Sequence, residues 1–172
     1  MATSELLLPF ADREDPASNA PQDTIITSAA SATTNAFQTE IPVLAFDATT
    51  DENTSWAYKV PANYVSGGTL VYQWLCTGDQ SGNVVWKASI YVATANSSDI
   101  DTSAAFNTVD TQTTALPATA GHFTTTSIAL TSPGLAADRY MILMVGRDAS
   151  HASDTASTDA QLISVAFQYT SS

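Results

Sequence analysis

The sequence has few basic residues and few charges of either sign. It contains 5 Lys and Arg against 17 Asp and Glu, a net charge of −12, and charged residues make up 13% of its 172 positions, against about a quarter in ordinary globular domains. A nucleic-acid-binding protein neutralises phosphates with a basic stripe, and an anionic membrane surface repels an acidic chain. We therefore expect neither nucleic acid nor a membrane as a partner.

Cysteine and long apolar runs are scarce too. Cys76 is the only cysteine, so no internal disulfide can form, and its place in the run LVYQWLC predicts a small core side chain. The apolar patch LLLPF near the start is too short to span a membrane, and no positive charge precedes it as in a signal peptide. GxSxG, HExxH and phosphate-cradling glycine motifs are also missing. These absences predict a protein that is not an enzyme and has no cofactor.

Residues 1–40 differ in composition from the rest of the chain. Acids, Pro, Asn and Ser follow LLLPF, and a tract of small polar residues comes next, a composition that does not bury itself. One interpretation is a disordered tail with an accidental leucine run. The other is an extended N-terminal arm that docks on a neighbouring subunit, with partner-binding side chains Leu6, Leu7, Leu8 and Phe10.

From residue 41 to 172 the pattern is one strand after another. Strand-like segments occupy residues 41–47, 55–60, 69–76, 83–94, 106–113, 122–131, 139–147 and 160–169, and several of them alternate apolar and polar residues. Turn signals such as TGDQSG and SPGLAAD separate these segments. About eight antiparallel strands without crossover helices predict an all-β fold, a two-sheet sandwich of the jelly-roll type. An immunoglobulin-like topology is the alternative, although its Cys/Trp/Cys framework is absent.

The predicted strand over 139–147 is apolar on both faces. One face carries Tyr140, Ile142 and Met144, and the other carries Met141, Leu143 and Val145. Such a strand must be covered on both sides, either by a loop of its own chain or by another subunit. We favour another subunit, and predict that Met141, Leu143 and Val145 bind it.

The segment GRDASHASDT, residues 146–155, concentrates reactive side chains in one loop. A catalytic triad would need His151 held rigidly beside Ser150 or Ser153, which a loop rich in Ser and Ala rarely achieves. Carboxylates from Asp148, Asp154 and Asp159 could bind calcium. An Asp-capped turn or an ion pair of Arg147 with an aspartate is the competing explanation, so we predict no metal site.

The run DENTSWAYKVPANYVSGGTLVYQWLCTGDQSGNVVWKASIYVA has an ordered series of turn and core residues. The series comprises Asp51, Glu52, Trp56, Pro61, Tyr64, Gly67, Gly68, Trp74, Ser81, Gly82, Val84 and Trp86. It continues with Gly121, His122, Arg147, Asp148, Asp154, Thr155, Asp159, Ala160 and Leu162. This order resembles jelly-roll structural proteins of tailed-bacteriophage virions. The similarity covers about residues 45 to 169.

The resemblance implies a capsid decoration, or cement, protein on the outer surface of the virion. Its partners would be the major capsid protein and further copies of itself, most simply in a homotrimer, although dimers and monomers stay open. The alternative is a tail- or fibre-associated module that recognises host-surface glycans. In that case exposed aromatic rings would hold the sugar, and the candidates are Trp56, Tyr64 and Tyr91.

Overall fold

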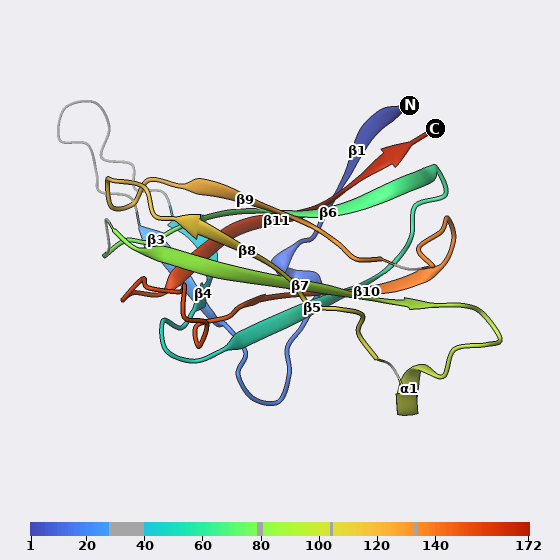
Figure 1. Cartoon of the computed structure of the whole chain (residues 1–172), viewed down its shortest axis with the longest axis horizontal. Coiled ribbons are helices and arrows are strands. Elements are labelled where there is room, and N and C mark those ends of the chain that lie inside the picture. Colours follow the sequence, from blue (N-terminus) through green and yellow to red (C-terminus); the bar gives the residue numbers. More distant parts are fainter. Residues whose placement is uncertain (28–39, 79–80, 104, 133) are drawn as a thin grey trace.

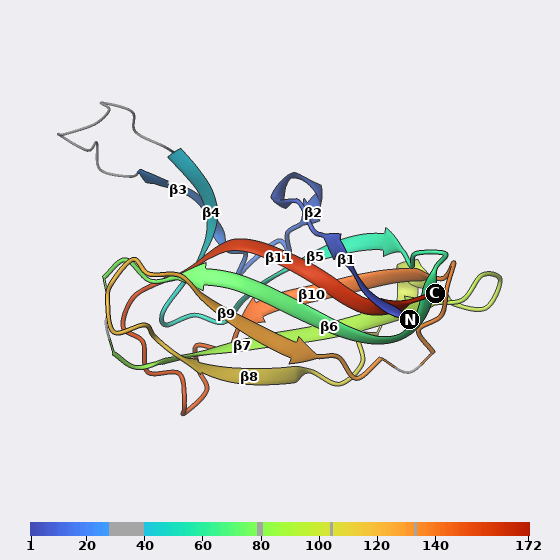
Figure 2. The ribbon, with the colours of Figure 1, turned by 90° about the horizontal axis from the view of Figure 1, so that it is seen from above.

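The computed structural model of the chain describes residues 1–172 except 28–39, 79–80, 104 and 133. Two antiparallel sheets pack face to face (Figures 1 and 2). The first sheet, in the order of pairing, contains β3 (Gln22–Thr27), β4 (Glu40–Phe46), β11 (Ala160–Ser171), β6 (Tyr64–Leu75) and β9 (Thr124–Ala129), with β1 (Ala2–Leu7) also paired to β11. The second contains β2 (Arg13–Glu14), β5 (Glu52–Lys59), β10 (Tyr140–Arg147), β7 (Asn83–Ala93) and β8 (Asp110–Ala115).

The order of strands is that of a jelly roll. Strands β4 to β11 correspond in chain order to the predicted strands, and they divide into the four-strand paths β4-β11-β6-β9 and β5-β10-β7-β8. The prediction of an all-β jelly-roll sandwich is confirmed. The helices that the structure describes are the short η1 (Phe10–Asp12) and α1 (Ile100–Ser103), and neither is long and apolar enough to cross a membrane.

Alternation along the strands builds the core between the sheets. In β7, Val84, Trp86 and Ile90 point inward and are buried completely. The ring of Trp86 meets those of Phe46, Tyr72 and Trp74 edge-on, with centroids 5.1, 5.2 and 5.6 Å apart. Each such aromatic pair contributes about 0.5–1.5 kcal/mol beyond the burial of its surface. The aromatic centre of the sandwich therefore joins β4, β6 and β7.

The two faces of β10 have different surroundings from those predicted. Met141, Leu143 and Val145 are buried completely in the core between the sheets, so in the folded chain they are not exposed to a partner. The opposite face carries the half-buried Ile142 and Met144. Both faces of this strand carry apolar side chains, as expected from the sequence. The face that points away from the core, however, is the one with Tyr140, Ile142 and Met144.

The described part of the predicted arm, residues 1–27, joins the sandwich. Strand β1 pairs with β11, β2 with β5, and β3 with β4. Leu8 donates its N–H to the carbonyl of Val165 at 3.0 Å and is 3% exposed, whereas Leu7 is 62% exposed. Leu6 and Phe10 pack against the core. The leucine run therefore docks on its own domain; residues 28–39 of the predicted arm lie outside the described residues, and a domain boundary at residue 40 stays a prediction.

Leu8 and Leu7 offer a matched test of this docking. We expect Leu8→Ala to lower the free energy of unfolding by about 2–5 kcal/mol because it leaves a cavity in the core. Leu7→Ala, on the exposed side of the same segment, should change it by less than about 0.5 kcal/mol. Urea unfolding followed by tryptophan fluorescence measures both values. Equal effects of the two substitutions would contradict the docked arrangement of the arm.

Candidate functional site

A cavity of about 480 Å³ opens at the end of the sandwich where β7 finishes and β10 begins. We call it the end pocket. Its walls come from two turns, residues 93–100, which lead from β7 into α1, and residues 137–140, which lead into β10. Both segments lie at the end of the molecule that carries α1 in Figure 1. Ligand pockets in proteins commonly have volumes of about 300–1,000 Å³, so the end pocket is large enough for a small ligand.

Backbone hydrogen bonds fix both walls of the end pocket. In the first turn, the hydroxyl of Ser98 accepts a hydrogen bond from the N–H of Thr94 at 2.9 Å, and the N–H groups of Ser97 and Ser98 donate to the carbonyl of Thr94. In the second, the N–H of Val60 donates to the carbonyl of Arg139 at 2.7 Å. These bonds hold the two turns in place without a ligand.

The turns need unusual backbone conformations at two polar positions. Asn96 has φ of 59° and Asp138 has φ of 64°. This left-handed region is unfavourable for most side chains, and Asn and Asp tolerate it best after glycine. The residue types in the sequence therefore allow the tight turns that bring the two walls of the pocket together.

Tyr140 provides an aromatic surface in the end pocket. It is the first residue of β10, it lies on the outer face of the sheet between its paired neighbours Lys59 and Ala93, and it is 39% exposed. The exposed apolar side chain of Ile100 lines the same cavity. Tyrosine combines a flat apolar face with a polar hydroxyl. This corner of the pocket is thus suited to a ligand that has an apolar face and a polar rim.

Polar groups of several kinds surround this ring. Thr94, Asn96 and Ser98 contribute hydroxyl and amide groups to the lining. Asp138 forms an exposed ion pair with Lys59 at 2.6 Å, and Arg139 donates from Nη1 to the carbonyl of Gly134 at 2.7 Å. A cavity that mixes one aromatic ring with neutral hydrogen-bonding groups and a guanidinium can bind a small, hydroxyl-rich molecule.

The aromatic residues proposed as sugar platforms from the sequence lie elsewhere. Trp56 is buried completely, and its Nε1 donates to the carbonyl of Pro9 at 2.7 Å. Tyr91 is 9% exposed, and Tyr64 lies beside Tyr169 with its hydroxyl bonded to the carbonyl of Gly67. Trp56 and Tyr91 are therefore buried, and Tyr64 is half-buried. Tyr140, which was not among these candidates, is more exposed than Trp56 and Tyr91, and its position on the outer face at the start of a strand was a usable signal in the sequence.

The GRDASHASDT loop is organised around a buried arginine. Arg147 is 0% exposed, and its guanidinium contacts both carboxylate oxygens of Asp154, at 2.8 and 3.1 Å. Its remaining N–H groups donate to the carbonyls of Phe46, Thr158 and Ala156. These contacts satisfy the five N–H donors of a guanidinium. Asp154 also accepts a hydrogen bond from the N–H of Val85, so the ion pair fastens the loop to both sheets.

Each carboxylate of this loop that could have bound calcium has another hydrogen-bond partner. Asp154 is engaged by Arg147, Asp159 accepts from the N–H of Ala48, and Asp148 accepts from the hydroxyl of Ser150. Across the described ranges, no group of three or more His, Cys, Asp or Glu side chains could hold a metal ion. His151 is exposed, and its Nδ1 accepts from the N–H of Ser153. The geometry supports the ion pair, which the sequence left open beside calcium.

The acidic turn before β5 is also structural. Asp47 accepts hydrogen bonds at one oxygen from the hydroxyl and N–H of Thr49 and the N–H of Thr50, and these bonds lower its pKa. Glu52 is 8% exposed and accepts from the N–H of Asp47 at 2.7 Å. Burial raises the pKa of Glu52. These carboxylates stabilise the turn from residue 46 to residue 52.

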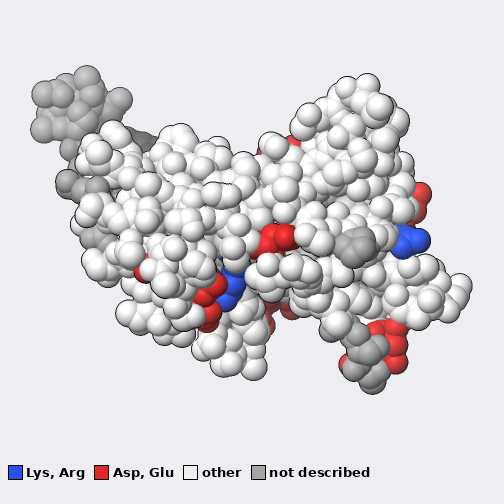
Figure 3. Space-filling view, in the orientation of Figure 1, with Lys and Arg blue, Asp and Glu red and all other residues white. Residues whose placement is uncertain are grey.

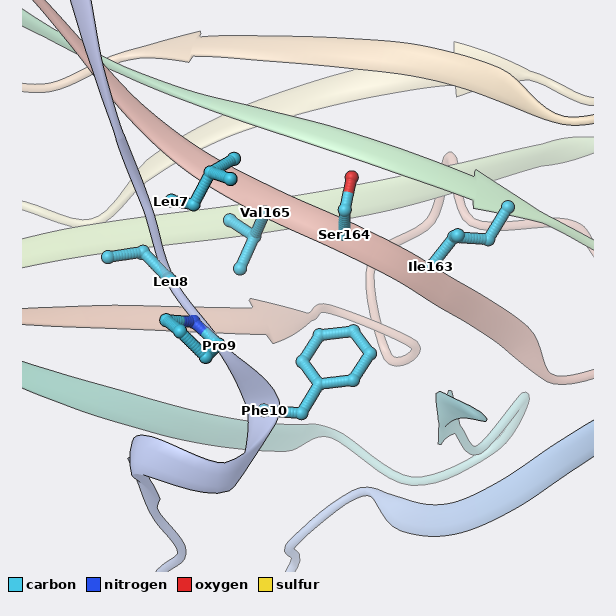
Figure 4. A pocket seen from close by; sticks show the side chains of 7 residues that line it. All are labelled: Leu7, Leu8, Pro9, Phe10, Ile163, Ser164 and Val165. Atoms are coloured by element: carbon cyan, nitrogen blue, oxygen red, sulfur yellow. The ribbon is translucent and has the colours of Figure 1, made fainter. Parts of the chain in front are cut away.

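A second, apolar cavity lies beside the docked N-terminal segment. It has a volume of about 240 Å³ and is lined by Leu7, Leu8, Pro9, Phe10, Ile163, Ser164 and Val165 (Figure 4). Strand β4 pairs with residues 160–162 of β11, and β1 pairs with β11 from residue 166 onward. The cavity therefore occupies the part of β11 that neither neighbour covers. Of the four N-terminal side chains predicted to bind a partner, Leu7, Leu8 and Phe10 line this cavity and Leu6 does not, and Leu7 is 62% exposed.

Comparison with known proteins gives distant likenesses in structure. No protein-family model and no curated protein matches the sequence. Among solved structures, CBM35 from Cellvibrio japonicus Abf62 has a TM-score of 0.44 and 13% identity, covering 98% of this chain and 99% of that one. The family 11 carbohydrate-binding module from Clostridium thermocellum, in complex with a mixed-linked tetrasaccharide, has a TM-score of 0.47 and 11% identity, covering 97% and 96%.

A bacteriophage protein is among the similar structures as well. The enzymatically active domain of tailspike protein 4 from bacteriophage CBA120 has a TM-score of 0.41 and 11% identity, over 96% of this chain and 19% of that one. Likenesses at these TM-scores and identities carry no argument about ligand or partner. The strand order described above defines the class of this chain, an all-β jelly-roll sandwich.

Proposed function

We propose that the chain is a non-catalytic module that binds glycans in the end pocket. The observation that carries this proposal is the partly exposed ring of Tyr140 in a cavity of about 480 Å³ that is also lined by Thr94, Asn96 and Ser98. A sugar ring has an apolar C–H face and a rim of hydroxyl groups. The tyrosine ring can pack against the apolar C–H face of the sugar, and the hydroxyl and amide groups of the lining can form hydrogen bonds with its hydroxyl groups.

The fixed backbone of the end pocket supports the same proposal. Binding loses affinity when loops must be ordered at the moment of association. Here the turns at residues 94–98 and 138–140 are already closed by hydrogen bonds to Thr94 and Val60. On the face of the molecule in Figure 3, most of the surface is neither acidic nor basic. The lining of the end pocket includes the neutral polar side chains Thr94, Asn96 and Ser98, which suit a ligand rich in hydroxyl groups.

The lining of the end pocket also supports a role in binding without catalysis. Hydrolysis of a glycosidic bond generally uses two carboxylates on opposite sides of the sugar. Asp138 is the one carboxylate among the residues that line this cavity, and it is paired with Lys59. A glycan held there would meet no second acid in the described lining.

A glycan microarray tests this proposal directly. We expect the fluorescently labelled chain to bind a subset of immobilised oligosaccharides, and soluble copies of the same sugars should displace it. The control is the Tyr140→Ala variant, which should bind more weakly to every sugar that the wild-type chain binds. If the folded chain binds no glycan on an array that spans plant, bacterial and animal sugars, the proposal is contradicted.

Contact with another protein is a second candidate, favoured by the apolar cavity beside the N-terminal segment. Leu7 is 62% exposed there, and the paired strands β3 and β4, with Ile25 56% exposed, extend away from the sandwich (Figure 2). Attachment to a phage capsid protein or to further copies of the chain in a virion would cover such surfaces. Co-sedimentation with purified viral shells tests this candidate, and a chain that stays in the supernatant opposes it.

A further inference from the structure

The basic side chains of this acidic protein are almost all neutralised by its own carboxylates. Arg13 pairs with Asp15 and Asp23, Lys59 with Asp138, Lys87 with Asp51, and Arg147 with Asp154. Arg139 is the remaining one of the five basic residues. Within the parts of the chain that the structure describes, it has no ion pair with a carboxylate.

Arg139 lines the end pocket next to Tyr140. Its guanidinium has five N–H donors, and the hydrogen bond that anchors it runs from Nη1 to the carbonyl of Gly134 at 2.7 Å. That bond fixes one side of the group and leaves donors for a ligand. The other charged residue of the lining, Asp138, is balanced by Lys59 at 2.6 Å. The unbalanced charge of the lining is therefore positive.

We infer that the end pocket selects glycans that carry a carboxylate, such as uronic or sialic acids. This inference rests on the proposed function and specifies its ligand class. An arginine binds a carboxylate through two parallel N–H···O bonds, and an acidic sugar carries its carboxylate directly on the ring. One cavity that holds both the ring of Tyr140 and the guanidinium of Arg139 can take both parts of such a sugar.

The net charge of the whole chain makes this selectivity depend on Arg139. With a net charge of −12, the protein as a whole repels anions. The overall charge of the protein therefore does not attract an anionic sugar, and binding of such a sugar needs a cation at the site itself. Lys59 and Arg13 are held by carboxylates, so Arg139 is the group positioned to provide that cation in the end pocket.

The test compares acidic glycans with matched neutral ones by isothermal titration calorimetry. The probes are oligogalacturonate, a xylo-oligosaccharide bearing glucuronic acid, and sialyllactose, each beside the same glycan without its carboxylate. We expect the full chain to bind at least one acidic member about tenfold or more tightly than its neutral counterpart, since a hydrogen-bonded charge pair contributes about 1.5–3 kcal/mol.

Two variants that each lose one positive charge distinguish a contact in the end pocket from an effect of the overall charge of the protein. Arg139→Gln should abolish the difference between acidic and neutral partners, because it weakens binding of the acidic glycan far more than binding of the neutral one. Arg13→Gln removes the same charge from a position outside the lining of the pocket and should preserve the difference. Circular dichroism confirms that both variants are folded.

The possible outcomes distinguish this inference from the proposed function. Equal or tighter binding of the neutral glycans by the wild-type chain overturns the selectivity and leaves glycan binding intact. A preference for acidic glycans that survives Arg139→Gln also overturns the inference. Failure of the chain to bind any glycan, acidic or neutral, overturns both.

Discussion

Arg147→Met lowers the free energy of unfolding by about 3–5 kcal/mol, the cost of breaking a buried ion pair from one side. Asp154, whose side chain is 1% exposed, keeps its charge but loses its partner, and the carbonyls of Phe46, Ala156 and Thr158 lose their donor. Domains of this kind are stable by about 5–15 kcal/mol. The substitution therefore removes a large part of the total stability, and equilibrium urea unfolding measures it.

Two controls define this effect. Lys59→Met removes one side of an exposed ion pair, with side chains 68% and 59% exposed, and should change the stability by less than about 1 kcal/mol. Arg147→Met combined with Asp154→Leu removes both buried charges and should recover part of the loss. If Arg147→Met is as mild as Lys59→Met, the loop is not held by the buried pair, and this explanation of the GRDASHASDT segment fails.

The second large effect concerns ligand binding. Tyr140→Ala should weaken the binding of the preferred glycan about 30-fold or more, which corresponds to about 2 kcal/mol, a value typical of an aromatic residue central to an interface. Because Tyr140 is 39% exposed and on the outer face of the sheet, the fold should survive. Titration calorimetry gives the affinity, and thermal unfolding gives the stability.

Phe123→Ala is the matched control for this prediction. Phe123 is an exposed aromatic residue, 62% accessible, that lines a separate cavity with Gly121 and His122. Its removal should leave the affinity for the glycan within about twofold of wild type, as for a residue outside the contact area. Equal losses in the two variants would show that the binding site is not the end pocket.

Much of the fold was predictable because its causes are local. Trp86, Ala88 and Ile90 recur at every second position of β7, and this period-two pattern predicts the face that meets the core. The opposite face, predicted to be solvated, is buried at Val85, Ser89 and Tyr91. Turn residues between such segments then gave the approximate strand boundaries. With strands but no crossover helices, a two-sheet sandwich was the natural solution, and the observed strand order agrees with the jelly roll.

The choice of buried face on β10 and the position of the N-terminal segment were harder to predict. Periodicity shows that Met141 and Ile142 are on opposite faces, but not which face meets the other sheet, because both are apolar. Leu8 reaches the core because its N–H bonds to the carbonyl of Val165, far away in the sequence. Such long-range backbone pairing leaves no pattern in the residues near Leu8.

Only part of the candidate site could be predicted from the sequence, because its contacts also join residues that are far apart along the chain. The ion pair of Arg147 with Asp154 is local, and the sequence offered it as one alternative. Its acceptor at Phe46 is 101 residues away and could not be inferred. The end pocket likewise joins the turn at Asn96 to the turn at Asp138, and only the pairing of β7 with β10 brings these turns together.

The central claim, that the end pocket holds a glycan, is tested most directly by nuclear magnetic resonance. The isotope-labelled chain is titrated with the tightest-binding glycan while backbone amide signals are followed. We predict saturable shifts at Thr94, Asn96, Ser98 and Tyr140, with the signals of Leu7, Leu8 and Phe123 unchanged. Shifts centred on the cavity beside Leu8, or on Phe123, with none at Tyr140, would contradict it.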